Sequence, residues 1–412
     1  MSTLQQTTSV AGAFGPAAIS RYPSRCFRVV LLAVLIFSTG ACGLFGGEEE
    51  EDQPAELVKF KSQIKIKKAW SKSLGGDTEN LRLALRPVSD GKRIYAATHE
   101  GKVIALDALK GKKLWQIKTK VPFTGGPALG EGVLVIGSNN GDVVAVRADD
   151  GQELWRKKVS SEVLARPAVA GQQVFVRTVD GKLSAHNLSN GDVKWSVQQS
   201  VPRLQVRGTA APVIRGNLVL CAFDNGKLVA YDISDGAVVW DVLLNPPQGR
   251  TEIERLADLN STVQAIGQDV FAVGYQGQVG AVAIESGQLI WSRELSSYSG
   301  LSADLSNLYV SGQQSEVYAL TRQAGREVWR NELLLFRDLT GPELFGQSVV
   351  VGDFEGYLHF LNVRTGEFQA RTRAGSDRIA SKPLVVNELL YVQTDGGKLY
   401  AFRDATRKKK GS

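Results

Sequence analysis

The chain has 412 residues, of which 43 % are hydrophobic and 22 % are charged, and 43 are glycines. This composition excludes an intrinsically disordered chain and predicts a globular protein with many turns. The formal net charge is only +7, and part of it comes from arginines near the N-terminus. A charge this small does not favour a nucleic acid as the partner.

The first forty-one residues resemble a bacterial signal peptide. Arginines precede an apolar run over residues 29–37, which is too short to span a membrane. Small residues then lead into Cys42, as in a bacterial lipobox, and Gly43 follows where aspartate would oppose sorting to the outer membrane. We predict a signal peptide over residues 1–41 and a lipid anchor with palmitate on Cys42. An ordinary cleavage site in a soluble secreted protein is the alternative.

The segment after Cys42 is rich in glycine and glutamate and has little to bury. We therefore predict a lipidated cysteine and flexible acidic linker over residues 42–60. A folded body is expected over residues 61–405 and a basic C-terminal tail over residues 406–412. Of the three cysteines, Cys26 leaves with the signal peptide and Cys221 lies in an apolar run, so no intrachain disulfide is predicted.

One motif recurs along the body of the chain. It is an alanine, a glycine six residues later and a tryptophan four residues after that, first seen as Ala105, Gly111 and Trp115. The seventh copy decays to Gly366 and Ala370. Successive motif glycines are 38 to 51 residues apart, which is the period of a four-stranded propeller blade.

The two ends of the body predict one further blade. Residues 383–402 supply three strands without a tryptophan strand, and residues 66–74 supply a tryptophan strand without a blade before it. We predict an all-β, eight-bladed β-propeller that closes by pairing the N-terminal strand with the C-terminal blade. The fixed spacing favours packing between blades as the role of the tryptophans. They are Trp70, Trp115, Trp155, Trp195, Trp240, Trp291 and Trp329.

The repeat resembles that of the quinoprotein dehydrogenases, which use pyrroloquinoline quinone (PQQ). Catalysis in that family needs a metal-bound quinone and often a pair of neighbouring cysteines, which this chain lacks. His99, His186 and His359 fall in separate repeats, so they predict neither a zinc site nor a catalytic triad. We predict no enzyme activity, catalytic residue, metal or cofactor. A PQQ-dependent dehydrogenase and a glycan-binding propeller are the alternatives.

Three stretches are more specific than the repeat: residues 201–208, 249–258 and 352–359. They resemble the BamB family, whose members are propeller lipoproteins of the outer-membrane β-barrel assembly (BAM) complex. The resemblance implies a scaffold that binds a POTRA domain of BamA and assists the folding and insertion of nascent β-barrel proteins. It also implies a lipid-anchored location on the periplasmic side of the outer membrane.

The same resemblance implies the residues that contact BamA. Val206 stands where the family has leucine, and Asn260 where it has aspartate. Independently, the connections after Trp195 and Trp240 are long and adjacent in the ring, so both should project from one face. The alternative is that Arg207 and Asp258 only pair with each other. The implied contacts are Leu204, Val206, Arg207, Asp258 and Asn260.

Overall fold

The structure is a computed structural model, and it describes residues 52–76, 78, 81, 83–205, 210–251, 253–254, 256, 258–259 and 261–406. The chain divides into two compact units, Met1–Gln53 and Pro54–Ser412, and the second holds every described strand. The predicted signal peptide, Cys42 and residues 407–412 of the predicted tail lie outside the described residues. No helix in the described part has the length and apolar content that crossing a bilayer needs.

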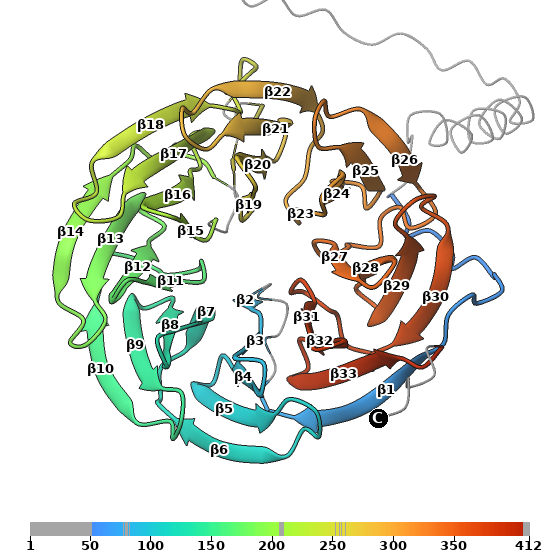
Figure 1. Cartoon of the computed structure of the whole chain (residues 1–412), viewed down its shortest axis with the longest axis horizontal. Coiled ribbons are helices and arrows are strands. Elements are labelled where there is room, and N and C mark those ends of the chain that lie inside the picture. The colour runs from blue at the N-terminus through green and yellow to red at the C-terminus, as the bar shows by residue number, and fades with distance from the viewer. Residues whose placement is uncertain are drawn as a thin grey trace, which may run out of the picture. The chain divides into compact units, whose positions relative to one another are not determined.

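The second unit is a ring of eight sheets, seven of four strands and one of five (Figure 1). Consecutive strands pair antiparallel from the centre of the ring to its rim, except that β2 (Ala84–Leu85) adds to β7 in parallel. Blades 1 to 4 consist of β3 (Val88–Ser89), β4 (Arg93–Ala97), β5 (Lys102–Asp107) and β6 (Lys113–Lys118); β7 (Phe123–Gly130), β8 (Val133–Ser138), β9 (Asp142–Arg147) and β10 (Glu153–Lys158); β11 (Ala168–Ala170), β12 (Gln173–Arg177), β13 (Lys182–Asn187) and β14 (Val193–Gln198); and β15 (Val213–Arg215), β16 (Leu218–Ala222), β17 (Lys227–Asp232) and β18 (Val238–Leu243).

The last blade closes the ring with strands from both ends of the unit. Its outermost strand is β1 (Ile66–Ser73), which pairs with β33 and sets Trp70 opposite Ala401. This confirms the predicted eight-bladed propeller and its closure. Blades 5 to 8 consist of β19 (Gln264–Ile266), β20 (Asp269–Val273), β21 (Gln278–Ala283) and β22 (Leu289–Glu294); β23 (Leu301–Ala303), β24 (Asn307–Ser311), β25 (Val317–Thr321) and β26 (Glu327–Asn331); β27 (Glu343–Phe345), β28 (Ser348–Gly352), β29 (Tyr357–Asn362) and β30 (Phe368–Arg373); and β31 (Leu384–Val386), β32 (Leu389–Gln393), β33 (Lys398–Asp404) and β1.

Seven of the eight outermost strands carry a tryptophan that bonds to the next blade. Trp155 donates from Nε1 to the carbonyl oxygen of Leu188 at 2.7 Å, and the other six tryptophans make the equivalent bond at 2.7–3.2 Å. The next motif glycine, Gly191, lies so close that a Cβ there would come within 2.7 Å of the indole. Within its own blade Trp155 pairs with Ala145, which leaves room for the ring. These contacts explain the alanine, glycine and tryptophan spacing.

The seventh motif ends in Ala370, and the construction of blade 8 explains the missing tryptophan. The third and fourth strands of that blade come from opposite ends of the unit, so no turn joins them to receive an indole. The chain before β1 lies there instead. The N–H of Gln63 donates to the carbonyl of Gln369 at 2.8 Å. Ile64 packs against the apolar cluster that contains Ala370.

The core lies between adjacent blades. One cluster joins Val135 and Trp155 of blade 2 to Val174 and Leu188 of blade 3, and all four are buried. The middle strands of each blade are buried on both faces, whereas outermost strands such as β10 alternate between exposed and buried residues. Apolar side chains packed between adjacent blades therefore hold the ring together, as expected for a repeat fold.

Candidate partner-binding face

The long connections leave the propeller on one face, which we call the loop face. In seven of the eight blades, the residue that follows the outermost strand donates its N–H to the carbonyl of the glycine in the turn between the second and third strands of the same blade. Leu244 donates to the carbonyl of Gly226 at 3.1 Å in blade 4, and Leu295 donates to that of Gly277 at 3.1 Å in blade 5. The connections between blades therefore share this face with those turns.

Two long connections lie side by side on the loop face. Residues 199–212 join blade 3 to blade 4, and residues 244–263 join blade 4 to blade 5. Each presents an aliphatic side chain to solvent: Leu204 is 42 % exposed and Ile253 is 65 % exposed. Exposed aliphatic groups on neighbouring loops can anchor a protein partner in a pocket. The reasoning from sequence missed Ile253, although it singled out the stretch that contains it.

The other predicted contacts divide into two groups. Val206, Arg207 and Asn260 lie outside the described residues. Asp258 is fully buried, and its carbonyl oxygen accepts a hydrogen bond from the N–H of Tyr275 at 2.9 Å. That bond ties the second long connection to the turn of blade 5. Asp258 is therefore buried, whereas Leu204 and Ile253 are exposed.

A buried ion pair lies at the turn on which the second connection rests. Arg177, at the end of β12, places Nη2 2.9 Å from Oδ2 of Asp224 in the next blade, and both side chains are almost fully buried. The guanidinium also donates to the carbonyl of Ala222 at 2.5 Å and stacks 4.5 Å from the Phe223 ring centroid. Burial raises the pKa of Asp224, and Arg177 opposes this shift. The second connection rests on this turn, because Leu259 donates to the carbonyl of Phe223 at 3.4 Å.

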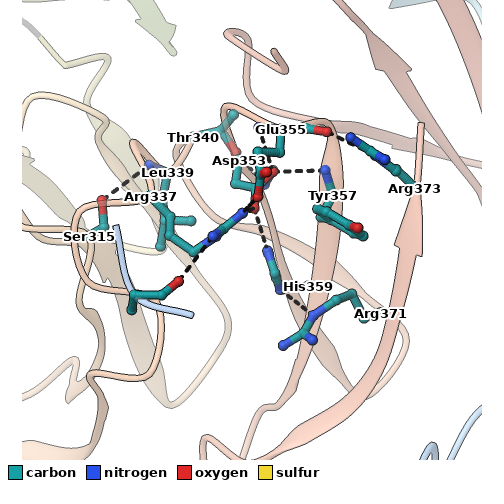
Figure 2. Close-up of polar contacts among 12 residues, drawn as sticks. Ser315, Arg337, Leu339, Thr340, Asp353, Glu355, Tyr357, His359, Arg371 and Arg373 are labelled. Carbon is teal, nitrogen blue, oxygen red and sulfur yellow. Dashed lines mark hydrogen bonds and ion pairs between the residues drawn. The ribbon is translucent and has the colours of Figure 1, made fainter. Parts of the chain in front are cut away.

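A second polar cluster occupies the loop face at blade 7, in the stretch 352–359 that the sequence singles out (Figure 2). Oδ1 of Asp353 accepts the backbone N–H groups of Glu355 and Tyr357 at 3.0 and 2.8 Å, which fixes the turn between β28 and β29. Its Oδ2 accepts Nε of Arg337 at 2.8 Å and Nε2 of His359 at 3.0 Å. Figure 2 shows Asp353 at the centre of this cluster.

This cluster holds the chain that precedes β1. Arg337 donates to the carbonyl of Ala55 at 3.0 Å, and Arg371 donates to that of Val58 at 3.0 Å. Phe60 stacks on Phe368 with ring centroids 5.0 Å apart. The sequence assigns these residues to the flexible linker, but from Ala55 onward the segment contacts the propeller. Its apolar residues pack against blade 7. The sequence did not predict this packing, because the acidic stretch just before these residues made the whole segment read as a linker.

The protonation state of His359 links this cluster to pH. Its Nε2 donates to Asp353, and its Nδ1 accepts Nε of Arg371 at 3.1 Å, so only the neutral ring fits. Burial lowers the pKa of His359. Because the folded-state pKa lies below the unfolded value of about 6.5, the contribution to stability is complete above that pH. It is lost as the pH falls through the folded-state pKa.

We expect His359→Gln to flatten the fall in the free energy of unfolding below pH 6.5. Glutamine can donate to Asp353 and accept from Arg371 without taking up a proton. One histidine contributes at most about 1.4 kcal/mol per pH unit, and urea unfolding at several pH values measures the slope. Burial also lowers the pKa of His186, so His186→Gln is the matched comparison. This variant should retain the contribution of His359 to the pH dependence of the free energy of unfolding. A slope equal to that of the wild type would contradict this assignment.

Known proteins share both the sequence and the ring. A family model described as outer membrane protein assembly factor BamB matches residues 62–123 and 99–331. The curated BamB of Pseudomonas aeruginosa is 40 % identical over 90 % of this chain and 97 % of its own. The chain belongs to the BamB family. The Escherichia coli member is 34 % identical over 90 % of this chain and 97 % of its own. The crystal structure of BamB from Moraxella catarrhalis covers 82 % of this chain and 99 % of its own, with a TM-score of 0.75 and 27 % identity.

More distant structures share the fold alone. The quinohemoprotein alcohol dehydrogenase of Comamonas testosteroni covers 84 % of this chain and 78 % of its own, with a TM-score of 0.63 and 14 % identity. At 14 % identity, the similarity between this dehydrogenase and the chain shows a shared fold only. In the described part of this chain, no group of three or more histidine, cysteine, aspartate and glutamate side chains is placed to hold a metal ion.

Proposed function

We propose that this chain is a non-enzymatic scaffold of outer-membrane protein assembly that binds a POTRA domain of BamA through the loop face. The observation that carries the proposal is the pair of exposed aliphatic side chains, Leu204 and Ile253, on adjacent long connections. Relatives named outer membrane protein assembly factor BamB support the setting. The partner contacts include Val206, Arg207 and Asn260. Asp258 contributes by holding the second connection in place.

In this proposal the chain is a lipoprotein of the outer membrane that faces the periplasm. Acyl chains on Cys42 hold it there, since several chains together anchor a protein stably where one chain does not. The propeller then binds the rest of the BAM complex and assists nascent β-barrel proteins. Its rigidity suits this role, because every blade interface is bonded through a tryptophan or through the chain before β1.

Binding to BamA tests the proposal directly. We expect Leu204→Ala and Ile253→Ala each to weaken binding of the chain from residue 43 onward to the periplasmic domains of its own BamA by about tenfold or more. The reason is that each aliphatic side chain is expected to fill a pocket on BamA, and truncation leaves that pocket empty. Isothermal titration calorimetry gives the affinity, and Arg207→Ala extends the test to the charged contact.

Leu305→Ala is the matched control. Leu305 is 87 % exposed and lies in the turn between β23 and β24, on the opposite face from the long connections. Its truncation should leave the affinity unchanged. If Leu305→Ala weakened binding as much as Leu204→Ala and Ile253→Ala, the loop face would not be the specific binding surface. Wild-type affinity in folded Leu204→Ala and Ile253→Ala variants would also show that the partner binds elsewhere.

A further inference from the structure

Three cationic side chains lie just before the innermost strands of three blades. The proposed function uses none of them. Arg86, Arg166 and Lys382 each directly precede a proline, before the first strand of blades 1, 3 and 8. The residue before a proline is held in an extended conformation, so the three backbones are alike. In three other blades the same position before a proline is small: Gly126, Ala211 and Gly341.

Arg86 and Lys382 extend across the centre of the ring, and each interacts electrostatically with Arg166. Nζ of Lys382, from blade 8, donates to the carbonyl of Leu301 and to Oγ of Ser302 in blade 6, both at 3.2 Å. Nη2 of Arg86, from blade 1, lies 2.7 Å from Oε2 of Glu343 in blade 7. Each contact therefore passes over an intervening blade. Figure 1 shows the strands that follow or contain these residues around the middle of the ring.

Small residues leave space beside these side chains. A Cβ built on Gly341 would lie 3.6 Å from Cδ of Lys382, so the lysine runs directly over that glycine. The side chains of Arg86, Glu343 and Lys382 remain 18–23 % exposed although other groups surround them. They are therefore enclosed yet still reachable from solvent.

The positive charge at the centre is not balanced. Among the described residues, Glu343 is the only carboxylate that contributes to the pKa shifts of the three cations. Arg166 makes no hydrogen bond or ion pair within the described part, and Nε of Arg86 is buried without a hydrogen-bond partner there. Three cations and one carboxylate leave two excess positive charges.

Burial makes this excess costly. Burial and, to a smaller extent, the charge of Arg86 together lower the pKa of Arg166 to about 10. The pKa of Lys382 is lowered to about 8, mainly by burial; Glu343 opposes this shift, whereas the charges of Arg86 and Arg166 contribute to it. Enclosed charges in proteins are normally paired, and a cluster that lacks internal partners is matched by an anion.

We propose that a small molecule with two or more oxyanion charges, as phosphate or carboxylate groups, binds at the centre of the ring among Arg86, Arg166 and Lys382. The planar guanidinium donors of the arginines fit such groups in a bidentate manner, and the lysine adds a point charge. The bound anion joins blades 1, 3 and 8, the last of which closes the ring. The site uses none of the residues proposed to contact BamA.

Calorimetric titration of the full chain in detergent with inorganic phosphate, and separately with citrate, tests the site. At constant ionic strength we expect one equivalent of at least one anion to bind with a Kd below about 1 mM. Arg166→Gln should weaken this binding by about tenfold or more. Arg166 has no polar partner in the described part, so the variant should fold. Comparing the two titrations shows whether the ligand carries phosphate or carboxylate.

Arg364→Gln is the matched control, because Arg364 is exposed in the turn between β29 and β30, and binding should remain at the wild-type value. Thermal unfolding gives a second readout: the anion should raise the midpoint of the wild type and of Arg364→Gln more than that of Arg166→Gln. General salt effects on stability act on all three proteins alike. Absence of binding by both anions, or binding and midpoint shifts unaltered by Arg166→Gln, would overturn the proposal.

Discussion

Asp224→Ala is expected to lower the free energy of unfolding by about 3–5 kcal/mol, since it leaves the buried guanidinium of Arg177 without its carboxylate. Both side chains are almost fully buried. The remaining contacts of Arg177, with the Ala222 carbonyl and the Phe223 ring, do not neutralise its charge. Urea unfolding followed by tryptophan fluorescence measures the loss.

Asp241→Ala provides the control in the same blade. Asp241 pairs with Lys227 at 2.7 Å, but both side chains are about 40 % exposed, so the loss should stay below about 1 kcal/mol. Similar losses in the two variants would contradict the distinction between buried and exposed pairs.

Replacing both partners of the buried pair separates the charge from the packing. Burial raises the pKa of Asp224 even beside Arg177, which indicates that the site disfavours charge. Nε of Arg177 and Oδ1 of Asp224 also have no hydrogen-bond partner among the described residues. The double variant Arg177→Met with Asp224→Leu should therefore recover most of the stability that Asp224→Ala loses. Because the pair lies beside the turn that holds Leu259 of the second connection, it also positions that connection on the loop face.

The eight-bladed ring could be predicted from the sequence because each blade repeats the same local contacts. An indole, a motif glycine and an alanine must keep their spacing wherever two blades meet, as Trp155, Gly191 and Ala145 do. Closure could also be predicted, since an unpaired strand at one end matched a missing strand at the other. Even the decay at Ala370 follows the same rule, because blade 8 offers no turn to receive an indole.

Contacts that cross between blades outside this repeat could not be predicted. Arg177 and Asp224 are 47 residues apart, and each lies beside a turn that the strand pattern already explains. The burial of Asp258 and the backbone bond from Tyr275 to its carbonyl oxygen are likewise not indicated by any residue pattern. The cations before the prolines were visible at blades 1, 3 and 8, but their convergence required the closed ring.

Trp240→Ala is expected to lower the free energy of unfolding by about 3–5 kcal/mol, because it opens a cavity between blades 4 and 5. The indole is 8 % exposed and donates to the carbonyl of Ile284 at 2.7 Å. Gly287 touches the ring and cannot fill the space, since its φ of +70° disfavours a side chain. Trp240→Phe should lose less, because it retains most of the apolar volume and removes only the hydrogen bond.

The neighbouring Val239 distinguishes interface packing from strand propensity. It lies on the same strand, β18, but its side chain is 49 % exposed, so Val239→Ala should change the free energy of unfolding by less than about 0.5 kcal/mol. A large loss at Val239, or a small one at Trp240, would show that the outer strand holds the ring through its backbone alone. The expected contrast instead indicates that each tryptophan side chain stabilises the interface between two blades. Loss of one tryptophan should therefore destabilise the ring that positions the loop face.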